Sequence, residues 1–195
     1  MSPQPKKSDF KRGFKAWADK QAIEFRKSLG LLEHDPLCAF ELCKHFKVQL
    51  LEPDDVDGLS AEQRKSLLLE GSNSWSAATV PLGNNQYLII HNPNHSPARQ
   101  QSNLMHELAH IICRHEVPIS ISSSEIIGIL RHYDKGQEDE ADWLGSCLQL
   151  PRPALLWAKK NGMTEEKISQ HYNASLEMVK YRIGKTGVNK QLRLY

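Results

Sequence analysis

The sequence predicts an α+β domain in which N-terminal helices pack on a small sheet and on one long helix. Three observations favour this class. Helix-period apolar patterns precede residue 47, strand-like apolar runs occupy 75–91, and helix-period segments return at 98–115 and 138–150. The chain has 195 residues, of which 39% are hydrophobic and 25% charged. This size and composition predict one domain with a core and a small appendage.

The N-terminal region predicts two helices after a disordered start. Residues 1–8 are polar and basic and contain two prolines, so we expect no regular structure there. Apolar residues then recur at three- and four-residue steps over 9–30, which predicts the first helix. Asp35 is a good N-cap residue and Pro36 suits the first helical position, so a second helix is expected to run from Asp35 to about Phe46.

The middle of the chain predicts the sheet. A short strand is expected at 48–51, and a capping pattern predicts a third helix over 59–71. Strand-like runs at 75–80 and 87–91 are separated by a turn-rich stretch at 81–85. The last two runs therefore predict a hairpin whose loop is 81–85.

The second half of the chain predicts helices joined by turns. A long helix is expected over 98–115 and another over 138–150, where Pro151-Arg152-Pro153 ends it. The remaining residues show short amphipathic patterns. The sequence thus predicts a main domain over 9–155 and a helical appendage over 156–195.

The appendage has the rhythm of a helix-turn-helix unit. A turn is expected at 172–175, and Lys180, Arg182 and Lys185 lie on the helix that follows. A DNA-binding unit has this form, and so does a helical segment that packs on the main domain. Because the basic set is small and the formal net charge is only +2, packing is favoured over direct DNA binding.

Composition narrows the function classes. The pI of about 8.3 is too mild to predict nucleic-acid or membrane binding by itself. No run approaches the roughly 20 apolar residues that a membrane span requires, so no membrane partner is expected. The start lacks the apolar segment of a signal peptide, and the four cysteines contain no Cys-x-x-Cys pair. These features predict reduced thiols in a cytoplasmic protein.

The strongest chemical signal is the run His106-Glu107-Leu108-Ala109-His110. Two histidines four residues apart project from one face of a helix and can bind one tetrahedral Zn²⁺. Glu107 adjoins the first ligand, so its carboxylate can take a proton from the attacking water without binding the metal. The run therefore predicts a zinc peptidase with His106 and His110 as ligands and Glu107 as the catalytic base.

A catalytic zinc site needs a third protein ligand. An extended three-histidine motif would place Gly at 113 and His at 116, where this chain has Cys113 and Glu116, and His115 is better explained as a helix-end histidine. Glu138 is the preferred third ligand, with Glu140 as its main rival. Asp142 shares a helical face with Glu138 and could accept a hydrogen bond from a ligand histidine.

Two other functions stay open on these residues. A structural or metal-sensing site would need a fourth protein ligand, which Cys113 could supply. A non-catalytic regulator could bind a repressor or DNA through the C-terminal helices, although it would have no chemical reason to place Glu107 beside the histidines. Among residues that could stabilise an oxyanion, the sequence does not rank the four candidates His91, His95, Arg99 and His132.

Two linked motifs resemble the ImmA/IrrE family of metallo-endopeptidases. The first is Arg-Gln-Gln-Ser-Asn-Leu-Met-His-Glu-Leu-Ala-His over 99–110, and the second is Glu-Asp-Glu-Ala-Asp-Trp-Leu-Gly over 138–145, which runs on to Leu-Gln-Leu-Pro. The resemblance covers about 75–155. The departures are Asp142, where the family often has Asn, and Leu-Gly at 144–145, where it often has Phe-Ala.

The resemblance implies a small zincin-like domain, a Zn²⁺ cofactor and Glu138 as the third ligand. It also implies an endopeptidase that cleaves a protein substrate. Characterised members of the family tend to cleave a helix-turn-helix transcriptional repressor and so switch on a stress or mobile-element response. A repressor of this kind is therefore the substrate that the resemblance predicts.

Overall fold

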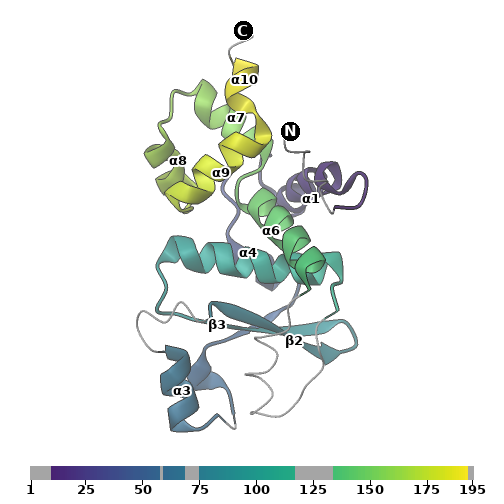
Figure 1. Cartoon of the computed structure of the whole chain (residues 1–195), viewed down its shortest axis with the longest axis vertical. Helices are drawn as coiled ribbons and strands as arrows, with labels where there is room; N and C mark the ends of the chain where they lie inside the picture. The colour runs from purple at the N-terminus through teal and green to yellow at the C-terminus, as the bar shows by residue number, and fades with distance from the viewer. Residues whose placement is uncertain (1–9, 58, 69–74, 117–133, 193–195) are drawn as a thin grey trace, which may run out of the picture.

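The computed structural model describes residues 10–57, 59–68, 75–116 and 134–192, and the protein is α+β as predicted (Figure 1). The elements in chain order are α1 Phe14–Ser28, α2 Ala39–His45, β1 Gln49–Leu51, the 3₁₀ turn η1 Pro53–Asp55, α3 Ala61–Leu68, β2 Ala77–Gly83, β3 Gln86–His91, α4 Pro97–Cys113, α6 Lys135–Gln149, α7 Arg152–Lys160, α8 Glu165–His171, α9 Leu176–Thr186 and α10 Val188–Leu192. The predicted disordered start at 1–8 lies outside the described residues, and so does the predicted end of the third helix at 69–71.

The sheet has the order β1-β3-β2, with β1 parallel and β2 antiparallel to β3. The predicted hairpin forms, but the prediction of a loop over 81–85 is wrong. Asn84 and Asn85 both adopt left-handed conformations, with φ of 50° and 57°, so a two-residue turn closes the hairpin. Pro81 lies within β2, which pairs only with β3 among the described strands, and Pro is tolerated in such a strand where its missing N–H would face away from the partner.

The second helix begins later than predicted. The Asp35 carboxylate accepts a hydrogen bond from the backbone N–H of Leu32 at 2.8 Å, so it closes the preceding turn instead of capping α2. The chain then runs extended to the N-cap residue Cys38. The Ala39 N–H donates to Oε1 of Gln101 at 2.7 Å, which ties the start of α2 to α4.

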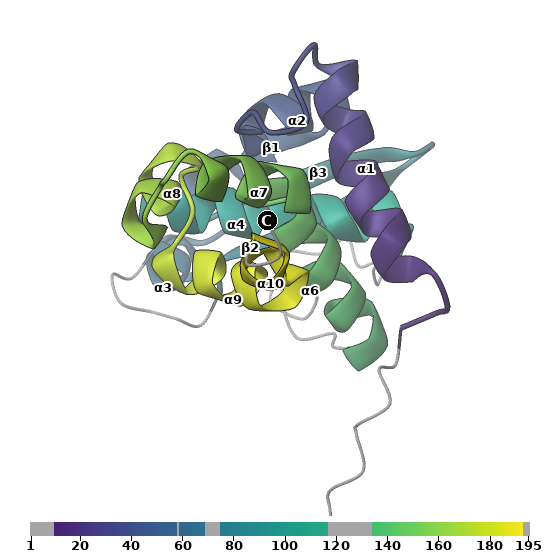
Figure 2. The same ribbon diagram turned by 90° about the horizontal axis from the view of Figure 1, so that it is seen from above.

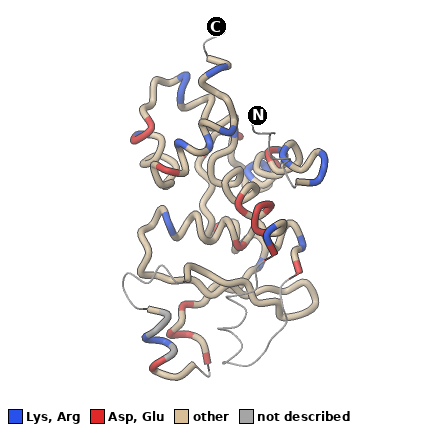
Figure 3. Tube along the Cα trace, viewed as in Figure 1, with Lys and Arg blue, Asp and Glu red and all other residues tan. Residues whose placement is uncertain are grey.

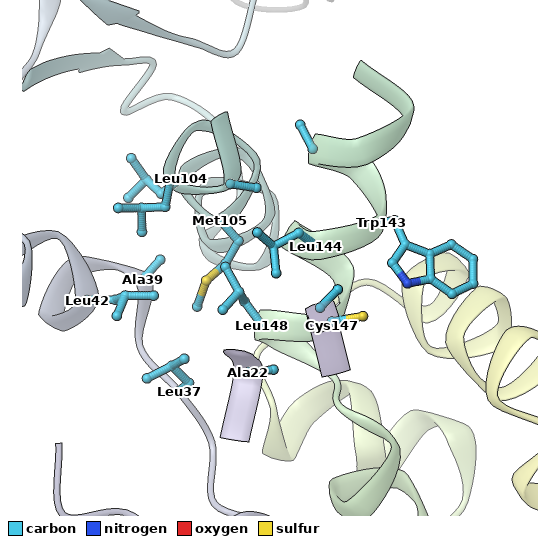
Figure 4. Packing of buried hydrophobic residues seen from close by; sticks show 14 of the residues in the cluster. Ala22, Leu37, Ala39, Leu42, Leu104, Met105, Trp143, Leu144, Cys147 and Leu148 are labelled. Atoms are coloured by element: carbon cyan, nitrogen blue, oxygen red, sulfur yellow. The ribbon is translucent and has the colours of Figure 1, made fainter. Parts of the chain in front are cut away.

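The main core lies where α4, α6, α1 and α2 meet. Figure 4 shows Met105 of α4 beside Leu144 and Leu148 of α6, and all three side chains are fully buried. Burial of each such side chain contributes about 1.5–3 kcal/mol. The helices approach closely at Gly145, where a Cβ would lie 3.1 Å from backbone atoms of α4. This contact brings α6 close to the backbone of α4.

The sheet lies against the other side of α4, and α1 runs beside α6 (Figures 1 and 2). Helix α4 is thus sandwiched between the sheet and α6. Side chains that α4 does not bury in the helical core can reach either β2 or α6. This arrangement positions the candidate site described below.

The C-terminal helices α7 to α10 have their own apolar core and lie on the far side of α4 and α6 from the sheet (Figure 1). Polar contacts join them to the end of α6, to α1 and to the loop before α2. Nε of Arg182 donates to the Leu150 carbonyl at 2.9 Å, and its Nη2 lies 3.3 Å from Asp19. The Tyr172 hydroxyl donates to the His34 carbonyl at 2.7 Å. The division of the chain at residue 155 stays a prediction.

Candidate metal centre

Helix α4 presents His106 and His110 together because its opposite side is buried. Leu104 and Leu108 are fully buried in the core, whereas both histidines keep some exposure. Pro97 occupies the first turn of the helix, where its missing N–H costs nothing. The 3.6-residue period then places the two imidazoles one turn apart on the same side.

The structure brings His106, His110 and Glu138 into one group. Nε2 of His106 lies 3.0 Å from Nε2 of His110 and 3.2 Å from Oε2 of Glu138, and Nε2 of His110 lies 3.4 Å from Oε1 of Glu138. A tetrahedral zinc ion with bonds of about 2.0–2.1 Å holds its ligand atoms about 3.3 Å apart. The spacing of the three donors therefore fits a zinc ion.

Asp142 supports the first histidine. Its Oδ1 lies 3.0 Å from Nδ1 of His106, the ring nitrogen that faces away from the group. A carboxylate in this place fixes the tautomer of a ligand histidine and raises its basicity. Glu138 and Asp142 both belong to α6, along which acidic residues gather (Figure 3).

The charges in the group are unevenly shared. Burial opposes charging of His106, but hydrogen bonds to Asp142 and Glu138 raise its pKa to about 10. Burial and the nearby His106 lower the pKa of His110 to about 4. The hydrogen bond with His106 lowers the pKa of Glu138. His106 therefore carries a proton that a bound metal cation would replace, whereas His110 is neutral.

Glu107 points away from α6 towards the sheet. Its Oε2 accepts a hydrogen bond from the Thr79 hydroxyl of β2 at 2.7 Å. Burial raises the pKa of Glu107, and the charge of His106 and the Thr79 bond lower it in part. A carboxylate with a raised pKa, held in one orientation by Thr79, is suited to take and return a proton.

A second group lies beside the first and consists of Cys113, His115 and Glu140. Nε2 of His115 lies 3.1 Å from Oε2 of Glu140, and its Nδ1 lies 3.0 Å from Nδ1 of His110. Glu140, the rival third ligand of the sequence analysis, therefore contacts His115. Cys113, the rival fourth ligand, belongs to this second group.

The candidates for oxyanion stabilisation have other contacts. His91 is buried at the end of β3 with its ring edge-on to Phe40. Nδ1 of His95 lies 3.0 Å from Nδ2 of Asn103, and Arg99 donates to the Ser76 hydroxyl at 3.4 Å. His132 lies outside the described residues.

Sequence reasoning missed two residues of the site. Thr79 belongs to no sequence motif, and its hydrogen bond to Glu107 depends on how strand β2 packs beside α4. His115 was explained as a helix-end residue, and its contact with His110 depends on the turn that follows α4. An odd spacing of three histidines at 106, 110 and 115 was the only available signal.

Comparison with known proteins agrees with the motifs. A family model named Peptidase_M78 and described as the IrrE N-terminal-like domain matches residues 43–184. No curated protein matches the chain. The matched stretch contains the sheet, α4, α6 and every residue of both groups, so the predicted resemblance to the ImmA/IrrE family is confirmed. The chain belongs to the Peptidase_M78 family of IrrE N-terminal-like domains, whose function is of the metallopeptidase type.

Proposed function

We propose that this protein is a zinc-dependent endopeptidase that cleaves a protein substrate. The observation that supports this proposal best is the group of three donors 3.0–3.4 Å apart, with the partly buried Glu107 next to it in the chain. His106, His110 and Glu138 would hold the ion and leave a fourth position open. A zinc ion there would polarise the substrate carbonyl and lower the pKa of an attacking water to about 7.

Glu107 is the proposed proton carrier. The hydroxyl and the backbone of Thr79 both bond the carboxylate and so fix the orientation in which it would accept the proton of the attacking water. Burial raises the pKa of Glu107, which makes the protonated carboxyl a better match for the leaving amine that it must then protonate. The same residue thus acts first as base and then as acid.

Strand β2 is the proposed binding site of the substrate. It pairs only with β3 among the strands that the structure describes, and Thr79 links it directly to Glu107. An extended peptide can add to such an edge through backbone hydrogen bonds, which set its register before the reaction. The strand therefore offers a way to hold a peptide bond beside the donor group.

The proposed substrate is a helix-turn-helix repressor in the cytoplasm. This proposal rests on the resemblance to the ImmA/IrrE family and on the family match. Within the described residues, no helix is long and apolar enough to cross a membrane.

The test compares wild-type protein with Glu107→Gln and Glu138→Gln. Zinc content is measured by mass spectrometry of the metal, and cleavage is measured by mapping new N-termini in a peptide library and in a co-expressed candidate repressor. We expect Glu107→Gln to keep one zinc ion and lose cleavage, and Glu138→Gln to lose the metal. Gln at 107 can still accept the Thr79 bond, so it is a matched control for the fold.

Two results would overturn the proposal. Wild-type protein that binds no zinc when the metal is abundant would refute the proposed zinc-dependent catalysis. Zinc-loaded protein that binds a repressor without cutting any substrate would favour the non-catalytic regulator. For that alternative the structure offers fewer free cations than the sequence suggested, because Arg182 is 1% exposed and bonded to Leu150 and Asp19.

A further inference from the structure

The turn after α4 returns the chain towards the metal centre. Arg114 adopts a left-handed conformation with φ of 55°, and the N–H of the next residue, His115, donates to the His110 carbonyl at 3.0 Å. This backbone arrangement is a common way to end a helix. Here it places the His115 ring beside the His110 ring, with the two Nδ1 atoms 3.0 Å apart.

The other side of the His115 ring faces α6. Its Nε2 lies 3.1 Å from Oε2 of Glu140, and the two side chains are only 5% and 16% exposed. Both nitrogens of His115 therefore have partners in a nearly buried place. The contacts form a continuous series from the carboxylate of Glu140 through His115 to His110.

The order of donors in this series follows from the role of His110. Two imidazole nitrogens at 3.0 Å need one N–H donor and one acceptor. If Nε2 of His110 gives its lone pair to a metal ion, its Nδ1 must carry the ring proton and donate to Nδ1 of His115. The proton of the His115 ring then lies on Nε2 and is donated to Glu140. Every contact is satisfied with two neutral rings and one carboxylate.

We propose that His115 and Glu140 are positioning residues for the ligand His110, and that they act as a hydrogen-bonded chain that fixes its tautomer and ring orientation. This inference rests on the proposed metal site. Asp142 has the same relation to His106, with a single 3.0 Å contact to the outward nitrogen. Both histidines of the centre would thus be anchored to α6, one directly and one through His115.

A second metal site at Cys113, His115 and Glu140 is the competing explanation. His115 already uses both ring nitrogens, at 3.0 Å from Nδ1 of His110 and 3.1 Å from Oε2 of Glu140. An ion bound through Nε2 of His115 would replace its hydrogen bond to Glu140, and an ion bound through Nδ1 would replace its contact with His110. The contacts therefore favour a supporting role over a second metal.

The test measures zinc affinity by competition with a chromophoric chelator. His115→Phe keeps the ring volume and removes both hydrogen bonds, so we expect zinc affinity to fall about 10–100-fold, as is typical when a supporting partner of a ligand is removed. His115→Gln can accept from His110 and donate to Glu140, so it should recover most of the loss. Cys113→Ser should leave the affinity unchanged.

Two further measurements separate positioning from general damage to the fold. The absorption bands of bound Co²⁺ should change in His115→Phe and return towards wild type in His115→Gln. Glu140→Gln keeps the side-chain size and should weaken zinc binding about tenfold, even if His115→Phe does not fold. Unfolding by urea in the presence of chelator reports the fold of each variant without metal.

The outcomes distinguish this inference from the proposed function. Wild-type affinity in both His115→Phe and Glu140→Gln would overturn the positioning chain while leaving the peptidase proposal intact. Two zinc ions per wild-type chain, with one lost in Cys113→Ser, would overturn it in favour of a second metal site. If wild-type protein binds no zinc, the proposed function fails, and the inference fails with it.

Discussion

Arg26 is a fully buried cation whose replacement should destabilise the fold strongly. From α1 it reaches the end of α6 and the loop before α2. Its nitrogens donate to the carbonyls of Asp35 at 2.8 Å, Ala22 at 2.9 Å, Leu148 at 2.9 Å and Gln149 at 3.4 Å. Carbonyls in the last turn of a helix lack partners within it, so Arg26 completes the end of the helix that contains Glu138.

The cost of Arg26→Met follows from these contacts. The Ala22 carbonyl keeps its bond within α1, and the Gln149 contact is long, so two well-bonded carbonyls, those of Asp35 and Leu148, lose their donor. Each buried unsatisfied group costs about 1–3 kcal/mol. Met regains part of this free energy through apolar packing. The variant also avoids burying a guanidinium, a cost that is reflected in the pKa of Arg26, which burial lowers to about 10. The net loss should be about 2–4 kcal/mol.

Urea unfolding in the presence of chelator measures this loss without a contribution from bound metal. Arg12→Met is the matched control, because Arg12 is exposed, and should change the free energy of unfolding by no more than about 0.5 kcal/mol. Arg182→Met should fall between the two, since Arg182 donates to one backbone carbonyl, that of Leu150. An Arg26→Met protein as stable as Arg12→Met, or more stable than Arg182→Met, would refute the reasoning.

Three further substitutions test the site and its support. Thr79→Val removes a side-chain hydrogen bond that lowers the pKa of Glu107, so the acidic limb of the pH profile of kcat/KM should move to higher pH, and Thr79→Ser should leave it in place. Asn85→Gly should raise the free energy of unfolding by about 0.5–1 kcal/mol, because Gly adopts the φ of 57° without strain, and Asn85→Ala should lower it. Gly145→Ala, whose Cβ would meet the α4 backbone at 3.1 Å, should be about 1–2 kcal/mol less stable in urea unfolding than Gly184→Ala, which has open space around it.

Local patterns predicted much of the fold because they depend on neighbours along the chain. The two histidines of α4 share a face through helical period alone, and the hairpin follows from two apolar runs. The predicted extent of the hairpin loop, 81–85, was wrong. Asn84 and Asn85 both adopt left-handed conformations, so two residues are enough to close the turn. The predicted start of α2 was wrong because the Asp35 side chain accepts a hydrogen bond from the N–H of Leu32 and so does not cap α2.

The site depends on contacts that no local pattern contains. Glu138 and Glu140 are two residues apart, so they point to different sides of α6, and either could meet the histidines. The buried residues of α6 fix how that helix faces α4, and in this packing Glu138 meets the histidines. His115 joins the site through Arg114, a left-handed residue that is not glycine and that no local pattern predicts there.

The protonation of the donor group leads to a prediction about zinc binding itself. The pKa of His106 is raised to about 10, far above its ordinary value, so this ring holds a proton at pH 7.5, whereas His110, with a pKa of about 4, does not. A metal ion requires neutral imidazoles, so zinc must displace about one proton from His106, and apparent affinity should rise with pH until about pH 10. Calorimetric titration in two buffers of different ionisation enthalpy counts these protons. Asp142→Asn removes a charge that favours the proton on His106, so this variant should release fewer protons when it binds zinc. Binding heats that are the same in both buffers would show that His106 is neutral before zinc binds.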